Sequence, residues 1–266
     1  MKIIFKILLL CLILIIAGCK SEEIVNPEDV YEEYTVVQAE LQPGEKFPAV
    51  RFTKTLPLGE AYDIKKSELK NVSVYIKKNG VQVIPLIYNF DGLYKPKYDF
   101  YVNEGEVYEL FAENDDKYIY AKTIIPFSPR IVSIRRNVNE YYLEANVTVS
   151  KDEVYGALWA IPGTALGKSK DFFSISNTDY NPNTNIIVRT SAMPEEYRLP
   201  VYLSNASIQV FAFDKGYRNY FYTRSSGQEV NDPFTQSSGK IEWNVQGDKV
   251  IGMFIGVTPG NIIKVE

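Results

Sequence analysis

The side chains of this sequence that could do acid–base chemistry are carboxylates, because the chain has 33 Asp and Glu and no His. The lack of histidine excludes Ser-His and Cys-His nucleophilic sites and removes the commonest zinc ligand. Two carboxylates at a defined separation are enough for glycoside hydrolysis, but chance pairs are expected among so many acids. We therefore predict no catalytic residue and no cofactor, and keep a carboxylate-dependent glycoside hydrolase as the enzymatic alternative.

An oxygen-rich stretch at 179–185 is the candidate for metal binding. Its oxygen side chains stand at every second position, as in a calcium loop; they are Asp179, Asn181 and Asn183. Thr184 occupies the sixth position, where such loops need glycine, and no glutamate follows at the twelfth. Asn and Pro also serve turns directly, so we predict a turn-rich loop with no metal.

Aromatic side chains crowd one predicted strand, 217–224. In a strand Tyr220 and Tyr222 share one face. Such rings can stack against a sugar or a partner protein, and the candidate ligand platform consists of Tyr217, Tyr220 and Tyr222. The alternative is core packing of one face, and core positions are also expected for Trp159 and Trp243.

A cysteine with small and aliphatic neighbours ends the apolar N-terminal segment. Lys2 and Lys6 precede an apolar run at 7–16, which is the order of parts in a secretory signal and too short to span a membrane. The four closing residues resemble the bacterial lipobox; they are Ile16, Ala17, Gly18 and Cys19. We expect residues 1–18 to be removed as a lipoprotein signal peptide and the Cys19 sulfur to carry diacylglycerol. Each buried acyl methylene contributes about 0.8 kcal/mol to membrane anchoring.

The residues after the cysteine resemble a surface-export signal of Bacteroides-type lipoproteins; they are Lys20, Ser21, Glu22 and Glu23. We expect an outer-membrane protein displayed on the cell surface, with the periplasmic face as the alternative. Residues 19–33 have no apolar period and are interpreted as a lipidated flexible tether, which spans at most ~50 Å when extended.

Composition favours strands and argues against nucleic acid as a partner. The chain has 20 Tyr and 14 Phe but only three Met, and aromatic side chains suit a half-buried pleated surface. Its net charge changes from −4 to −6 when Lys2 and Lys6 leave with the signal, and it has no basic cluster. Cys19 is the only cysteine beyond the signal, so the mature protein must build its core without disulfides.

Alternating apolar and polar residues predict short strands separated by turns, the pattern of β-sandwiches. In the first strand, 34–41, Val37, Ala39 and Leu41 face inward. The Asn-Gly pair at 79–80 predicts a type I′ hairpin, because both central residues of that turn need positive φ. Further strands are expected at 49–56, 72–77, 118–125, 130–135, 141–149, 153–161, 171–175, 186–190, 206–213, 217–224, 240–246 and 249–257, with one helical turn at 193–199.

Tyr108 is the candidate for a tyrosine corner. It follows Gly105 by three residues and opens an alternating run. In such corners the phenol bonds a nearby backbone group, and the alternative is that Tyr108 is an ordinary strand tyrosine.

Pro126 and Pro129 remove two backbone donors and interrupt the strand pattern, so we place a domain boundary there. This predicts an all-β protein of two consecutive β-sandwich domains of immunoglobulin-like, Greek-key type. The N-terminal sandwich is expected at 34–126 and the C-terminal β-rich domain at 130–266.

Short motifs along the mature chain resemble one known family. In the C-terminal third they are Tyr-Arg-Asn-Tyr-Phe-Tyr at 217–222, Asn-Asp-Pro-Phe at 231–234, Asn-Val-Gln-Gly at 244–247 and Val-Ile-Gly-Met-Phe-Ile-Gly at 250–256. Nearer the N-terminus the lipobox, Pro-Gly-Glu at 43–45 and the Gly-x-x-Tyr-x-Leu run at 105–110 agree with them. The sequence is similar to the outer-membrane lipoproteins of domain-of-unknown-function family 4249 (DUF4249). The family often has two glycines where this chain has Gly-Asp-Lys at 247–249, so the turn departs from its pattern there.

The resemblance implies a β-rich outer-membrane lipoprotein, often encoded near TonB-dependent receptors, and it supplies no catalytic residues. We expect a binding or accessory module that partners a TonB-dependent outer-membrane β-barrel transporter or another envelope protein. The alternatives are a carbohydrate-binding or glycan-cleaving surface protein and a structural envelope lipoprotein. Membrane contact is expected only through the N-terminal acyl chains.

Overall fold

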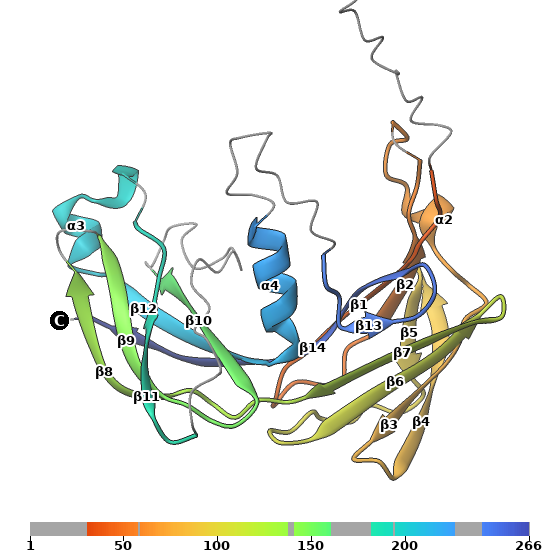
Figure 1. Ribbon diagram of the computed structural model, residues 1–266, viewed down its shortest axis with the longest axis horizontal. Coiled ribbons are helices and arrows are strands. Elements are labelled where there is room, and N and C mark those ends of the chain that lie inside the picture. Colours follow the sequence, from red (N-terminus) through yellow and green to blue (C-terminus); the bar gives the residue numbers. More distant parts are fainter. Residues whose placement is uncertain are drawn as a thin grey trace, which may run out of the picture. The chain divides into compact units, whose positions relative to one another are not determined.

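The computed structural model describes residues 31–57, 59–137, 141–160, 182–193, 195–226 and 241–265, and strands dominate them (Figure 1). The strands are β1 (Thr35–Leu41), β2 (Val50–Lys54), β3 (Ser73–Lys78), β4 (Gln82–Phe90), β5 (Leu93–Pro96), β6 (Val107–Asn114), β7 (Lys117–Ile124), β8 (Arg130–Asn137), β9 (Tyr142–Thr148), β10 (Glu153–Ala160), β11 (Asn185–Arg189), β12 (Ser207–Asp214), β13 (Val245–Gln246) and β14 (Val250–Lys264). The helical segments are α2 (Ile64–Ser67), the 3₁₀ turn η2 (Glu195–Tyr197), α3 (Pro200–Leu203) and α4 (Gly216–Ser226). The predicted all-β fold class is confirmed.

The predicted N-terminal features lie outside the described residues, namely the signal peptide, the lipobox, the export signal and most of the tether. The described residues Tyr31, Glu32, Pro57, Gly59 and Glu60 belong to a separate unit, in which the Glu60 amide donates to the Pro57 carbonyl. The strands and helices that the structure describes belong to another unit, which begins at Glu33. Among the helices that the structure describes, none has the length and apolar character needed to cross a membrane.

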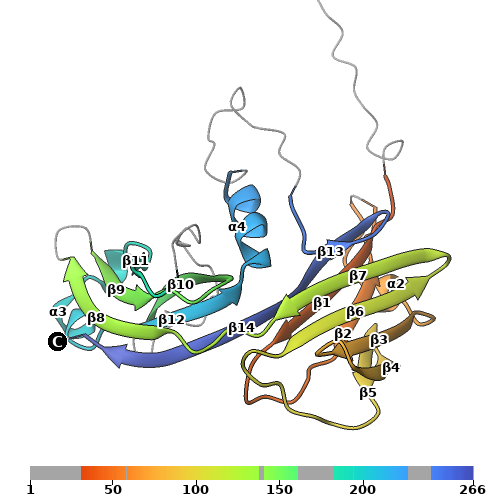
Figure 2. The ribbon, with the colours of Figure 1, turned by 60° about the horizontal axis from the view of Figure 1, so that its bottom comes forward.

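The strands form two sheets. One has eleven strands in the order β10-β12-β14-β1-β2-β5-β4-β3-β6-β7-β13, and the other has three in the order β11-β9-β8. β14 is a single long strand (Figure 2) that pairs in parallel with β1 through Gly256 and antiparallel with β12 from Val257 onward. Strands from both sides of the predicted boundary at 126–130 therefore enter one sheet, and the division into two domains stays a prediction.

Local sequence explains the first strands. Val37 and Leu41 of β1 are fully buried, as their alternation with polar residues predicts. Asn79 and Gly80 have φ of 52° and 70° between the paired strands β3 and β4, which confirms the predicted hairpin turn. Predicted strands at 130–135, 141–149, 153–161, 186–190 and 206–213 correspond to β8, β9, β10, β11 and β12, while 171–175 lies outside the described residues.

The first hydrophobic core lies on one face of the N-terminal strands. It contains Phe52 and Tyr94, whose rings meet edge to face with centroids 5.3 Å apart. The Tyr94 hydroxyl accepts from the Val72 amide at 3.0 Å and donates to the Leu69 carbonyl at 2.8 Å. The ring thus fills the core while its polar end satisfies backbone groups that would otherwise be buried without partners.

Two further cores cover the two faces of β10 and β12. On one face, Tyr155 and Trp159 pack with Val147 of β9 and Val188 of β11, so the three-stranded sheet and the larger sheet form a sandwich. On the other face, Val154 and Leu158 belong to a third core with Phe211 and Phe213. Because both faces of β10 are covered, its burial is nearly continuous and it lacks the alternation of a half-exposed strand.

The predicted strand at 217–224 is wrong, because this stretch is the helix α4. Tyr217 and Phe221 pack on the third core, and their spacing of four brings them to one helix face. Aromatic content favours strands only as a propensity, and packing against the sheet overrides it here. The predicted strand at 240–246 is shorter than expected, since only Val245–Gln246 pairs with β7.

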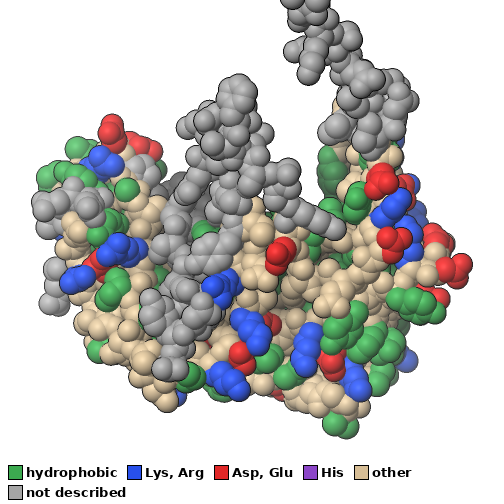
Figure 3. Space-filling view, in the orientation of Figure 1, with side chains coloured by type: hydrophobic (Ala, Val, Ile, Leu, Met, Phe, Trp, Pro, Cys, Tyr) green, Lys and Arg blue, Asp and Glu red, His purple; other side chains and the backbone are tan. Residues whose placement is uncertain are grey.

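Charged side chains alternate in sign on the face drawn in Figure 3 and do not gather by sign. Exposed ion pairs such as Lys46–Asp99 and Lys65–Asp91 are of this kind. Water screens such pairs, so they contribute little to stability. The three cores and the buried hydrogen bonds therefore dominate the stability of the fold.

The prediction that the Tyr108 hydroxyl bonds a backbone group is wrong, because it donates to the carboxylate of Glu106 at 2.5 Å. Glu106 also pairs with Lys78 at 2.7 Å and accepts from the Asn103 amide at 3.1 Å. Burial raises the pKa of Glu106, but the hydrogen bonds from Lys78, Tyr108 and Asn103 outweigh it and lower the pKa from 4.5 to about 2. Only a charged carboxylate can accept all of these bonds, which is the physical reason for the lower pKa.

We predict that Glu106→Gln destabilises the protein at neutral pH and removes part of its acid sensitivity. The folded pKa is depressed, so the contribution of Glu106 is complete above pH 4.5 and is lost as the pH falls towards 2. A shift of this size corresponds to roughly 3 kcal/mol of unfolding free energy. Urea unfolding measured between pH 7 and pH 2 checks this.

The matched control is Glu113→Gln, which alters an exposed carboxylate on β6, the strand that follows Glu106. It should leave the unfolding free energy within about 0.5 kcal/mol of wild type. A Glu106→Gln protein with the acid dependence of wild type would contradict the assignment.

Candidate functional site

A groove of about 680 Å³ contains residues singled out from the sequence. Its lining combines aromatic, apolar and polar side chains from six regions of the chain. They are Val36, Gln38, Ala39, Glu40, Ala49, Arg51, Leu93, Phe213, Tyr217, Tyr220, Trp243, Ile251, Gly252, Met253, Ile255 and Val257.

The floor of the groove is the face of β14, β1 and β2 that points away from the first core. Gln38 stands opposite Met253 of β14 and opposite Arg51 of β2, so these three side chains share that face. Since β1 pairs with β14 on one side and β2 on the other, its backbone groups are used within the sheet. A ligand on this floor therefore meets side chains and not free backbone donors.

The wall of the groove is aromatic. The Tyr217 ring stacks on Phe213 with centroids 4.4 Å apart and planes inclined by 13°. Tyr220, one helical turn further, lies 5.2 Å from Trp243 between ring centroids, with planes inclined by 35°. Tyr220 and Trp243 are both only partly buried, so they offer ring surface to a ligand.

Asn244 holds the neighbouring Trp243 over β14. The Asn244 amide group donates to the Phe254 carbonyl at 2.5 Å and accepts from the Phe254 amide at 2.9 Å. The side chain thus imitates a strand partner along this part of β14. These two hydrogen bonds fix Asn244 against the backbone of β14, and the neighbouring Trp243 is positioned with it.

Asp214 holds the start of α4. One carboxylate oxygen accepts from the Gly216 amide at 3.2 Å, where the helix dipole favours negative charge. The other accepts from the Thr123 hydroxyl at 2.7 Å and the Ile124 amide at 2.8 Å. The Thr123 hydroxyl in turn accepts from the Gly256 amide of β14 at 2.8 Å. One buried network therefore connects β7, β12, β14 and α4, and it places the aromatic wall beside the floor.

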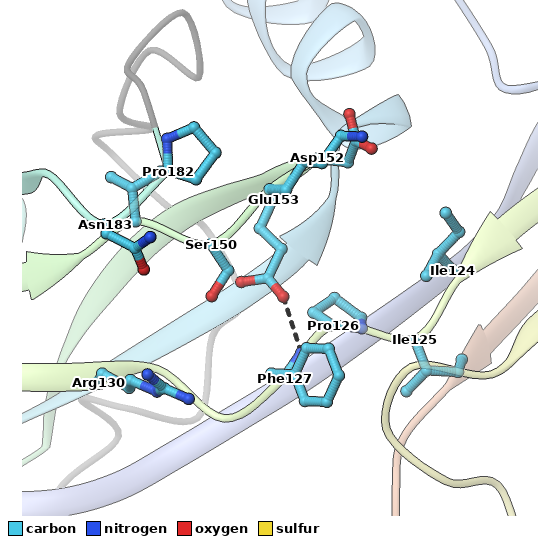
Figure 4. Close-up of a pocket in the computed structure, with 12 residues that line it drawn as sticks. Ile124, Ile125, Pro126, Phe127, Arg130, Ser150, Asp152, Glu153, Pro182 and Asn183 are labelled. Carbon is cyan, nitrogen blue, oxygen red and sulfur yellow. Dashed lines mark hydrogen bonds between the residues drawn. The ribbon is translucent and has the colours of Figure 1, made fainter.

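A second cavity of about 330 Å³ lies beside the segment that links β7 to β8 (Figure 4). Glu153 lines it and accepts from the Phe127 amide at 2.8 Å and from the Tyr155 hydroxyl at 2.6 Å. Burial raises the pKa of Glu153, and these bonds offset the rise only in part. Because both carboxylate oxygens have protein partners, Glu153 connects β10 to the linker and is not presented to the cavity as a free acid.

The structure brings together part of the predicted ligand platform. Tyr217 and Tyr220 both line the groove, on a helix and not on the expected strand. Nothing is described of the Tyr222 side chain. Trp159 occupies the core as predicted, whereas Trp243 joins none of the described cores and lines the groove. Only the spacing of three between the two tyrosines could have indicated a helix.

The candidate calcium loop is described only at Asn183. Asp179 and Asn181 lie outside the described residues, and Asn183 is exposed at φ 68° in a turn. Among the residues that the structure covers, no three His, Cys, Asp or Glu side chains gather closely enough to hold a metal ion.

No protein-family model matches this chain, and no curated protein matches it. Two solved structures, both titled as cytokine receptor complexes in different crystal forms, share 10% identity with it. The first covers 70% of this chain and 92% of its own, with a TM-score of 0.26, and the second covers 70% and 86%, with a TM-score of 0.25. Likenesses this low carry no inference about function.

We predict that Asp214→Ala destabilises the protein by about 2–4 kcal/mol, because it leaves the Thr123 hydroxyl and the Ile124 amide buried without their acceptor. The fluorescence of Trp243 should also change, since α4 loses its anchor beside the groove. Chemical unfolding and tryptophan emission check both effects.

Asp248→Ala is the matched control, because Asp248 is exposed and no described hydrogen bond involves its side chain. It should change the unfolding free energy by no more than about 0.5 kcal/mol. Equal stability of the two variants would show that the Asp214 network contributes nothing.

Proposed function

We propose that this protein is a lipid-anchored outer-membrane lipoprotein, displayed at the cell surface, that acts by binding a ligand in the aromatic groove. The observation that carries the proposal is the groove, where Tyr220 and Trp243 stand beside a mainly apolar sheet face that also carries Gln38, Glu40 and Arg51. Ligand sites typically combine apolar and aromatic lining with a few polar groups that orient the ligand. The lipobox at Cys19 and the tether at 19–33 supply the anchor and the reach in this proposal.

Binding is favoured over catalysis by the state of two carboxylates, the partly buried Glu106 and the buried Glu153. Glu106 is held charged by Lys78, and Glu153 is held between the Tyr155 hydroxyl and the Phe127 amide. Each carboxylate already has protein partners for its oxygens, whereas a catalytic acid or base must reach a substrate. Neither residue lines the aromatic groove.

Two consecutive immunoglobulin-like domains remain part of the proposal. It is supported by the tripeptide Glu-Val-Tyr, which recurs where β6 and β10 begin: at 106–108, one residue ahead of β6, and at 153–155, the first residues of β10. In both places the tyrosine hydroxyl donates to the carboxylate two residues earlier, at 2.5 Å and 2.6 Å. Recurrence of one local arrangement at the start of two strands is expected if the halves have related folds.

The occupant of the groove distinguishes two forms of the function. In the first, the protein is a partner of a TonB-dependent β-barrel transporter or another envelope protein, as the anchor and the resemblance to DUF4249 suggest. In the second, it binds a glycan, which the ring pair Tyr220 and Trp243 favours, since sugar rings stack on aromatic faces. Both forms need the same groove and the same anchor.

Substitution of the acylated cysteine tests the anchor. Cys19→Ala should shift the protein from the membrane fraction to the soluble fraction and abolish incorporation of labelled fatty acid, because no thiol remains to carry the lipid. The matched control is Cys11→Ala, which alters a cysteine inside the predicted signal and should leave both readouts unchanged. An acylated Cys19→Ala protein would overturn the lipoprotein assignment.

Substitutions in the groove test the binding site. Tyr220→Ala and Trp243→Ala should each weaken capture of the ligand at least tenfold, since an anchoring aromatic side chain commonly contributes 2 kcal/mol or more. Capture is measured with outer-membrane proteins solubilised in detergent and, separately, with a glycan array. Tyr118→Ala is the control, because this ring is 74% exposed and lies outside the groove. Capture that survives both groove substitutions would place the binding site elsewhere.

A further inference from the structure

Arg51 is a cation on the groove floor, and no described residue forms an ion pair with it. It is partly buried on β2, and within the described residues its guanidinium has no hydrogen bond or ion pair. The residues directly opposite it are Gln38 on β1 and Leu93 on β5, and neither carries a charge. A guanidinium presents a planar fork of donors that fits a carboxylate with two parallel hydrogen bonds.

The groove extends across the sheet from the aromatic wall to Arg51. Between them lie β14 and β1, and neighbouring strands are about 4.8 Å apart, so β2 lies about 10 Å from β14. A ligand that touches both the aromatic wall and Arg51 must therefore be extended on the order of 10 Å or more. One small ion cannot satisfy both ends.

The floor disfavours a peptide as the occupant. A peptide that adds to a sheet needs a strand edge, but the floor consists of strands paired on both sides. The amides of a bound peptide would be removed from water without backbone partners, which is costly. Hydroxyl groups of a sugar can instead bond Gln38 and the tyrosine hydroxyls, while the apolar face of a sugar ring lies on Tyr220 and Trp243.

We infer that the groove binds an acidic oligosaccharide, with one sugar ring on Tyr220 and Trp243 and a carboxylate on Arg51. This inference rests on the proposed function, because it names the ligand class of the same groove. Glu40 is the opposing charge on the floor, and its carboxylate accepts from the Gln42 amide group at 2.6 Å. Glu40 shares a face of β1 with Gln38, which stands opposite Arg51, so Glu40 is a diagonal neighbour of Arg51. Arg51 is the side chain on the floor that can pair with a carboxylate of the ligand.

The test uses the full-length lipoprotein purified in a neutral detergent. The probes are oligogalacturonates, hyaluronan and alginate oligosaccharides, each with a neutral oligosaccharide of equal length, and a set of acidic peptides. Affinities are measured by calorimetry. We expect an acidic oligosaccharide to bind at least tenfold more tightly than its neutral counterpart, as one charge-assisted pair provides. Raising the salt concentration should reduce this preference.

Substitution of Arg51 tests whether its guanidinium binds the carboxylate of the ligand. Arg51→Gln should abolish the preference for the acidic over the neutral oligosaccharide, and Arg51→Lys should retain part of that preference. Glu40→Gln should leave acidic binding equal or tighter. Circular dichroism and thermal unfolding establish whether each variant is folded. If the Arg51→Gln protein does not fold, the Arg51→Lys protein still provides the test.

The outcomes separate this inference from the proposed function. Equal affinity for acidic and neutral oligosaccharides, or a preference that survives Arg51→Gln, would overturn the inference while groove binding stands. If only the acidic peptides bind, and Trp243→Ala abolishes that binding, the inference is also overturned while groove binding stands. If no probe binds, and the groove substitutions do not change the capture of membrane proteins, both the inference and the proposed function fail.

Discussion

The pairing of β14 with two different strands along its length is the constraint on which the rest of the structure depends. Its first half lies parallel to β1 and its second half antiparallel to β12. The close approach to β1 requires Gly252, where a Cβ would lie 1.9 Å from the Val37 carbonyl oxygen and φ is +132°. No other residue fits this position without moving a backbone. One continuous strand thereby contributes Phe254 to the first core and Val257 to the third.

Side chains supply the hydrogen bonds that the irregular link between β7 and β8 cannot form within a sheet. The Thr258 hydroxyl donates to the Pro126 carbonyl at 2.6 Å, and Glu153 accepts from the Phe127 amide. Asp214 and Thr123 satisfy the end of β7 in the same way. Buried backbone groups need such partners. The network therefore holds the start of α4 and β14 in fixed positions beside each other, and these positions define the groove.

In the two Glu-Val-Tyr tripeptides the pKa of the glutamate shifts in opposite directions, because the neighbouring residues differ. In both, a tyrosine hydroxyl donates to the carboxylate. Lys78 pairs with Glu106, and the pKa of Glu106 falls. No described ion pair involves Glu153, and burial raises the pKa of Glu153. Folding is thus favoured by the charged form of Glu106 and opposed by that of Glu153. A shifted pKa at either residue follows from structure and needs no catalytic explanation.

The sequence by itself determined the all-β class, most strand positions and the hairpin at 79–80, because alternation and positive φ are local properties. It misassigned 217–224, since aromatic content favours a strand and only packing on Phe213 and the anchor at Asp214 select a helix. It also could not assemble the groove. Gln38, Arg51 and Trp243 are far apart in the chain and meet only because β1 pairs with both β2 and β14 and because Asn244 binds β14. Long-range strand pairing decides which side chains share a face, and no local pattern contains that information.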